Sequence, residues 1–173
     1  SGYAFVMKLV KRGQPLDQAR EVYRGEASDQ GSTGATVLTD AKGHRLVVIQ
    51  RRKTFFGADK LIWTPKGVTK LDLPDRTFPT AIVDGQVIFS TSDPWGAIPA
   101  GAIASAPLAE VERGVSNPTL VFAPNARQSV EGAADTRDRL IVTITDNVRG
   151  RAMVFDHGAA GWTSRPIVLP DNA

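Results

Sequence analysis

Residues 81–90 run Ala-Ile-Val-Asp-Gly-Gln-Val-Ile-Phe-Ser, two short apolar segments separated by an Asp-Gly pair. Asp-Gly between apolar segments is a strong signal for a tight β-hairpin, because both turn residues must adopt a positive φ. The second segment, Val87-Ile88-Phe89, contains no polar position, which is typical of a strand that is covered on both faces. The stretch therefore predicts a hairpin in which one strand lies between two other layers.

The same pattern recurs on both sides of this hairpin. The segments that match Val87–Phe89 are Leu46–Ile49 and Leu140–Val142. Repeat ends can be placed at Arg24, Pro74, Pro124 and Pro170. The spacings between these ends are 50, 50 and 46 residues by subtraction. A period of this length suits four-stranded β-propeller blades.

Turn residues divide the repeats into short strands. The first repeat is predicted to have strands at 36–39, 46–50, 60–63 and 68–73. The second has them at 81–83, 86–90, 101–105 and 119–122, and the third at 130–135, 139–145, 151–155 and 162–169. Half a repeat, 3–9 and 21–24, comes before them. Only 15–20 and 107–112 favour a helical turn.

These strands predict an all-β fold, a partial β-propeller of about three and a half four-stranded antiparallel blades. We expect a single domain over 1–173, with half a blade at 1–25 and blades at about 26–74, 75–124 and 125–173. The alternative is one irregular β-sandwich whose turn spacing only resembles a period. The chain starts at Ser1, without an initiator methionine, and enters a strand-like segment directly, so we expect it to be part of a longer protein.

Composition narrows the function classes. The chain has 173 residues, 42% of them hydrophobic, and no cysteine, which excludes thiolate zinc sites, disulfides and a cysteine nucleophile. A net charge of +3 gives little support to nucleic-acid binding, and no apolar run approaches the roughly 20 residues that span a bilayer. We therefore expect neither a nucleic-acid nor a membrane partner. The compartment is not determined, although the cytoplasm is favoured over the periplasm.

The sequence contains no pattern of catalytic or metal-binding residues. The nearest string to a Gly-x-Ser-x-Gly nucleophile turn, Gly31-Ser32-Thr33-Gly34, leads into a strand rather than a helix. His157 next to Asp156 could suggest part of a catalytic triad, but we favour a solvated turn for it and for His44. No ligand spacing for a metal is found. We predict no catalytic residue, metal or cofactor in this chain.

One rim of the predicted propeller carries long links, at 51–59, 91–100 and 146–150. Long aromatic loops on one face are common sites of binding or domain docking. The docking candidates are Phe55, Phe56, Trp95 and Arg149. In the alternative, the aromatic side chains fold back onto their own blades. The basic residues 51–53 could pair with single-stranded nucleic acid, but a solvated loop is favoured.

Three stretches resemble the propeller of bacterial serine peptidases of the prolyl oligopeptidase family: Gln128–Gly132, Thr136–Val142 and Asp146–Ala152. Residues 22–26, 83–85 and 121–124 are similar to that family as well. The resemblance implies a seven-bladed propeller that caps an α/β-hydrolase domain and restricts access to oligopeptides cleaved after proline. The hydrolase domain supplies the catalytic serine, aspartate and histidine, and no stretch here matches it.

The resemblance thus implies a propeller fragment that gates oligopeptide access and docks to a hydrolase domain of the same parent chain. By itself the fragment is expected to be inactive. The alternative is a non-enzymatic propeller scaffold, of the kelch or WD type, that binds a protein partner. An open arc of blades also exposes apolar inner faces, so we expect self-association.

Overall fold

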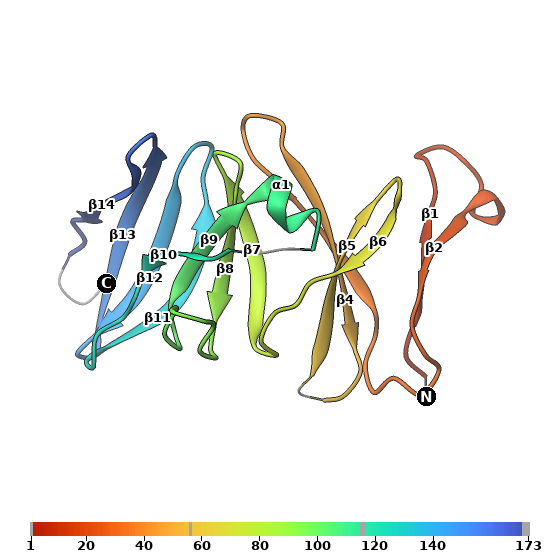
Figure 1. Cartoon of the computed structure of the whole chain (residues 1–173), viewed down its shortest axis with the longest axis horizontal. Coiled ribbons are helices and arrows are strands. Elements are labelled where there is room, and N and C mark those ends of the chain that lie inside the picture. Colours follow the sequence, from red (N-terminus) through yellow and green to blue (C-terminus); the bar gives the residue numbers. More distant parts are fainter. Residues whose placement is uncertain (1, 56, 115–116, 171–173) are drawn as a thin grey trace.

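The computed structural model describes residues 2–55, 57–114 and 117–170. Strands dominate these residues, and they form four separate antiparallel sheets that stand side by side along the long axis of the molecule (Figure 1). The prediction of an all-β fold with half a blade and three four-stranded blades is confirmed. The alternative of one irregular sandwich is wrong, because the strands of the described residues form four separate sheets.

The sheets follow one another in chain order. The first is a two-stranded hairpin of β1 (Val6–Leu9) and β2 (Arg20–Arg24). The second contains β3 (Gly34–Thr39), β4 (Arg45–Arg52), β5 (Ala58–Thr64) and β6 (Gly67–Lys70). The third contains β7 (Thr77–Val83), β8 (Gln86–Thr91), β9 (Ile103–Pro107) and β10 (Thr119–Phe122). The fourth contains β11 (Gln128–Asp135), β12 (Leu140–Asp146), β13 (Arg149–Gly158) and β14 (Gly161–Ile167).

Each four-stranded sheet is a simple meander, with its strands paired in sequence order. The first strands of successive sheets, β3, β7 and β11, contact one another. One rim, at the top of Figure 1, carries the turns between first and second strands and those between third and fourth strands. We call it the hairpin rim. The links between second and third strands, at 53–57, 92–102 and 147–148, form the opposite rim, the loop rim.

Apolar side chains fill the spaces between the four-stranded sheets. One cluster, with Ile62 and Phe89, lies between the second and third sheets, and another, with Ile88 and Leu140, lies between the third and fourth. Val87, Ile88 and Phe89 are 0% exposed, as the apolar run predicted. Burying one such side chain contributes about 1.5–3 kcal/mol, so strand β8 anchors both interfaces.

The ends of some elements differ from the prediction. Strand β6 stops at Lys70, yet Leu71 stays buried and its backbone N–H donates to the carbonyl of Lys60 at 2.8 Å. The helical turn expected after Pro107 is present as α1 (Leu108–Val111), whereas Leu16–Gln18 form a 3₁₀ turn. Within the described residues, no helix has the length and apolar character needed to cross a membrane.

The link predicted at 146–150 is not long, which corrects the expectation for that part of the loop rim. Asp146 pairs directly with Arg149, and only Asn147 and Val148 form the turn. Their φ values are +49° and +67°. Such a turn favours Asn-Gly, since a β-branched residue at positive φ is strained. Val148 is also 93% exposed, so no packing compensates for this strain.

Replacement of Val148 by glycine should therefore stabilise the chain by about 1 kcal/mol, because glycine adopts positive φ without steric strain. The measurement is the midpoint of urea unfolding. Val37→Gly is the control, since Val37 is exposed within strand β3, where glycine is unfavourable. Destabilisation by Val148→Gly would contradict the assignment of strain to this turn.

Candidate functional site

Phe55 lies at the tip of the β4–β5 link on the loop rim. A small turn presents it: Thr54 N–H donates to the carbonyl of Gly57 at 3.2 Å, and Gly57 N–H donates to the hydroxyl of Thr54 at 2.8 Å. The side chain is 72% exposed and lines a shallow depression with Phe78 of the next sheet. Phe56 lies outside the described residues. This link thus presents an aromatic side chain at the rim.

Trp95 packs against its own sheet. Its backbone pairs with Ile98 through two hydrogen bonds of 2.9 and 3.0 Å. The indole meets the ring of Phe89 edge-on, with 5.1 Å between the centroids. Trp95 is half-buried against the cluster between the second and third sheets. A docking partner at this position would meet only one part of the indole.

Arg149 is exposed and begins strand β13, directly after the two-residue turn. The three described candidates therefore lie in or next to the links of three sheets: Phe55 in that of the second, Trp95 in that of the third and Arg149 directly after that of the fourth. All these links lie on the loop rim (Figure 1). The candidates share a face of the molecule but do not form one cluster.

Basic residues near this rim bind carboxylates within the chain. Arg51 Nε and Nη2 both donate to Asp29, at 2.9 Å each, and Lys53 contacts Asp59 at 3.0 Å. Asp29 is 4% exposed and also accepts the backbone N–H of Glu26 at 2.9 Å. The hydrogen bonds from Arg51 lower the pKa of Asp29. The Arg51–Asp29 pair ties the link that follows β2 to strand β4.

Lys60 is a buried cation between the second and third sheets, and it is 2% exposed. Its ammonium group donates to the backbone carbonyl of Asp75 and lies 4.4 Å from the ring centre of Phe78. Burial lowers the pKa of Lys60. The sequence did not predict a buried Lys60, because the alternation of polar and apolar residues along β5 does not show which neighbouring sheet covers the strand.

His157 does not pair with its neighbour Asp156, nor is it a solvated turn residue, which corrects the expectation. It lies in strand β13, with its side chain 20% exposed, and its Nδ1 is 2.8 Å from Oδ2 of Asp84 in the third sheet. Asp156 instead accepts Arg139 Nε at 2.8 Å. His44 is likewise bound, with Nδ1 2.7 Å from Oδ2 of Asp40.

A polar cavity of about 440 Å³ opens beside these contacts on the hairpin rim. Turns of all three four-stranded sheets contribute to its wall, through Lys42, Asp84 and Asp138, and strand β13 contributes His157. Carboxylates and cations line it together, and Asp84 pairs with both Lys42 and His157. Among the described residues, no group of three or more metal-binding side chains is found.

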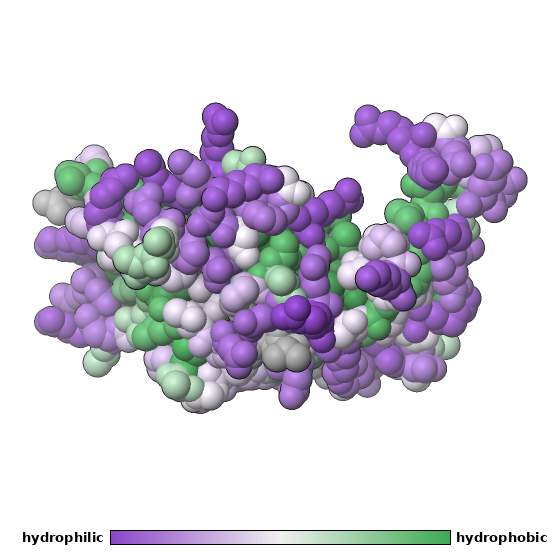
Figure 2. Space-filling model, turned by 45° about the horizontal axis from the view of Figure 1, so that its top comes forward, coloured by the Kyte–Doolittle hydropathy of each residue, from purple (hydrophilic) through white to green (hydrophobic). Residues whose placement is uncertain are grey.

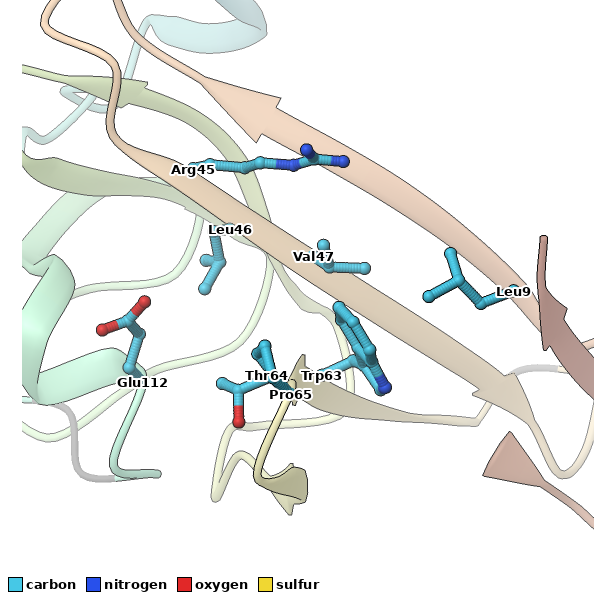
Figure 3. Close-up of a pocket in the computed structure, with 8 residues that line it drawn as sticks. All are labelled: Leu9, Arg45, Leu46, Val47, Trp63, Thr64, Pro65 and Glu112. Atoms are coloured by element: carbon cyan, nitrogen blue, oxygen red, sulfur yellow. The ribbon is translucent and has the colours of Figure 1, made fainter. Parts of the chain in front are cut away.

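An apolar groove separates the β1–β2 hairpin from the second sheet (Figure 2). Its walls carry Leu9, Val37, Val47 and Trp63. It continues into a hollow of about 380 Å³, where Figure 3 shows Glu112 on one side and Leu9 on the other, with Leu46, Val47 and Trp63 between them. Leu9 and Val37 are 43% and 47% exposed. This face of the second sheet is thus only partly covered by the hairpin.

Consecutive meander sheets whose first strands touch define part of a β-propeller. A solved structure of the same fold is that of a post-proline cleaving enzyme from Rickettsia typhi. The TM-score is 0.83 at 20% sequence identity, and the match covers 96% of this chain and 26% of that one. At this identity the likeness concerns the fold, and the predicted partial propeller is confirmed.

No protein-family model matches the chain. An uncharacterized peptidase of Sinorhizobium fredii is 36% identical over 188 residues, which cover 100% of this chain and 25% of that protein. An uncharacterized peptidase of Rickettsia prowazekii is 21% identical, over 96% of this chain and 24% of its own length. The chain thus spans about a quarter of the curated relatives it matches. The predicted resemblance is thus confirmed at two levels: to curated peptidases in sequence and to a post-proline cleaving enzyme in fold.

Arg51→Gln should loosen the β1–β2 hairpin, because it leaves the buried carboxylate of Asp29 without its main partner. Amide hydrogen exchange in β1 and β2 should rise, while exchange in β8 stays unchanged. Arg24→Gln is the matched control, since it removes an exposed ion pair with Glu21 from the same hairpin. Equal effects of the two variants would contradict the role of Arg51.

Lowering the pH should also loosen the β1–β2 hairpin. Asp29 has a lowered pKa in the folded chain, so the stability that the pair contributes is complete above the ordinary aspartate pKa of about 3.9. This stability is lost as the pH falls through the lowered pKa. Exchange in β1 and β2 followed from pH 6 downward, corrected for intrinsic rates, measures it, and Asp29→Asn should remove the pH dependence.

Proposed function

We propose that these residues are the propeller portion of a serine peptidase of the prolyl oligopeptidase type. In that role they restrict access to oligopeptides and carry a docking surface for a hydrolase domain. The observation that carries the proposal is the match of the whole chain to a quarter of a peptidase at 36% identity. The post-proline cleaving enzyme with the same fold supports it.

The restriction of access follows from the shape of a propeller. Successive sheets pack through apolar clusters with buried side chains, so a folded protein cannot pass between them. An extended oligopeptide is thin enough to pass along the axis lined by the first strands, β3, β7 and β11. We therefore expect the longer polypeptide to cleave short peptides and to leave folded proteins intact.

The loop rim is the proposed docking surface. Phe55 is exposed there, part of Trp95 is presented on the link of the next sheet, and exposed Arg149 directly follows the turn of the sheet after that. Aromatic and arginine side chains commonly carry the binding energy of interfaces. A hydrolase domain seated on this rim would close one end of the axis.

The test uses the longer native polypeptide with a proline-containing oligopeptide as substrate. Phe55→Ala should lower kcat/KM by about tenfold, the effect of losing one aromatic interface contact. Leu16→Ala is the control, since Leu16 is 81% exposed but lies in the link between β1 and β2, away from the loop rim. Equal loss in both variants, or loss in neither, would rule out docking at the loop rim. Absence of cleavage by the unaltered polypeptide would overturn the peptidase assignment.

The apolar groove leads to a separate expectation for the chain alone. We propose that it self-associates, because Leu9 and Val37 leave apolar surface open beside β1. Val37→Lys should shift the mass measured by light scattering towards the monomer. Leu120→Lys is the control, since Leu120 is 46% exposed but lies on edge strand β10 outside the groove. A monomeric unaltered chain would contradict the proposal.

A further inference from the structure

One carboxylate, that of Asp84, joins three consecutive sheets on the hairpin rim. Asp84 lies in the β7–β8 turn of the third sheet. Its Oδ1 accepts the ammonium group of Lys42, from the β3–β4 turn of the second sheet. Its Oδ2 lies 2.8 Å from Nδ1 of His157, near the end of β13 in the fourth sheet. Both oxygens of one side chain are thus occupied by different neighbouring sheets.

The turn that carries Asp84 is held in place by a second contact. Asp40, whose side chain is 3% exposed, accepts the backbone N–H of Gly85 at 3.0 Å. Asp84 and Gly85 have φ values of +52° and +72°, so they form a tight turn with little freedom. Side chains of the second sheet therefore bind both residues of this turn, Asp84 and Gly85.

The contact to the fourth sheet is also reinforced. The ring of His157 lies 4.9 Å from the ring of Trp162, and Trp162 Nε1 donates to the hydroxyl of Ser105 in the third sheet at 2.9 Å. Hydrogen bonds from Lys42 and His157 lower the pKa of Asp84, so the carboxylate is charged at neutral pH. The side chains of Asp84 and His157 are only 26% and 20% exposed, which strengthens their interaction over that of a surface pair.

These polar contacts act differently from the apolar clusters between the same sheets. Apolar burial has no preferred direction, so packed sheets can pivot slightly while most contact area is kept. Hydrogen bonds require heavy-atom distances of about 2.7–3.2 Å and near-linear geometry, so they are lost after a small movement. The contacts of Asp84 therefore define the separation of the sheets at this rim.

We infer that Asp84 is a clasp that fixes the angle between the three four-stranded sheets and so limits the opening at the hairpin rim. The inference rests on the proposed function where it concerns peptides: a wider opening would admit longer substrates. Asp84 is a positioning residue, since it acts through the sheets that it joins.

The first experiment needs no peptidase activity. Asp84→Asn removes the charge but keeps the turn, because asparagine tolerates positive φ. Exchange of the Gly85 amide should rise by about tenfold as the second and third sheets separate, while amides within β8 stay protected. Asp93→Asn is the matched control, since its carboxylate bonds Arg76 and both residues flank strands of the same, third sheet. Equal exchange of Gly85 in both variants would overturn the clasp, whether or not the longer polypeptide cleaves peptides.

Lys42→Gln is a second variant, which tests the same contact if Asp84→Asn does not fold. The side chain of Lys42 is 66% exposed, and this change removes only the Lys42–Asp84 contact, one of those between the second and third sheets. Gly85 exchange should rise in this variant too. His157→Gln should leave Gly85 protected and instead raise exchange at the Trp162 indole N–H, which bridges the third and fourth sheets. Increased indole exchange in Lys42→Gln together with increased Gly85 exchange in His157→Gln would contradict the clasp.

The second experiment uses the longer polypeptide. In Asp84→Asn, the ratio of kcat/KM for a long peptide to that for a short one should rise at least about twofold, as expected if the lost contacts had restricted entry. Asp93→Asn should leave the ratio unchanged. An unchanged ratio in Asp84→Asn, with accelerated Gly85 exchange, would overturn the link between the clasp and peptide entry.

Discussion

Coverage of both faces of each middle strand is the constraint on which this structure depends. Val87 and Phe89 of β8 face one apolar cluster, and Ile88 faces the other, with none of the three exposed. A four-stranded sheet with two apolar faces is not stable alone, so it must have a neighbour on each side. Because of this requirement, the sheets stack against one another around an axis. The turns lie at the ends of the strands, so the stack has two rims, one at each end.

The parts of the fold that local residues determine could be predicted from the sequence. The Asp84-Gly85 turn and the apolar run after it defined a hairpin between two layers, and Pro107 marked the start of α1. The β12–β13 turn was misjudged because Asn147-Val148 lacks the glycine that normally marks two positive φ values. A strained turn gives no favourable local signal.

The candidate site was predicted less well, because its contacts are long-range. His157 and Asp84 are 73 residues apart, and the sequence favoured a solvated turn for His157 instead. Lys60 had no visible partner in the sequence, since that partner is a backbone carbonyl on the link to the next sheet. The loop rim could be located from strand order alone, whereas the packing of Trp95 on Phe89 needed the structure.

In the gate that we propose, the two kinds of contact between sheets would have different roles. Apolar clusters supply most of the cohesion, and removal of a side chain such as Phe89 weakens the whole interface. Contacts like those of Asp84 add less cohesion but tolerate little movement. A gate needs both, because sheets that separate readily would lose the fold, and sheets that pivot freely would not exclude long substrates. The directional contacts lie at the hairpin rim. A given rotation of the sheets about the opposite rim separates them most at the hairpin rim. A few hydrogen bonds placed there therefore have the greatest control over the opening.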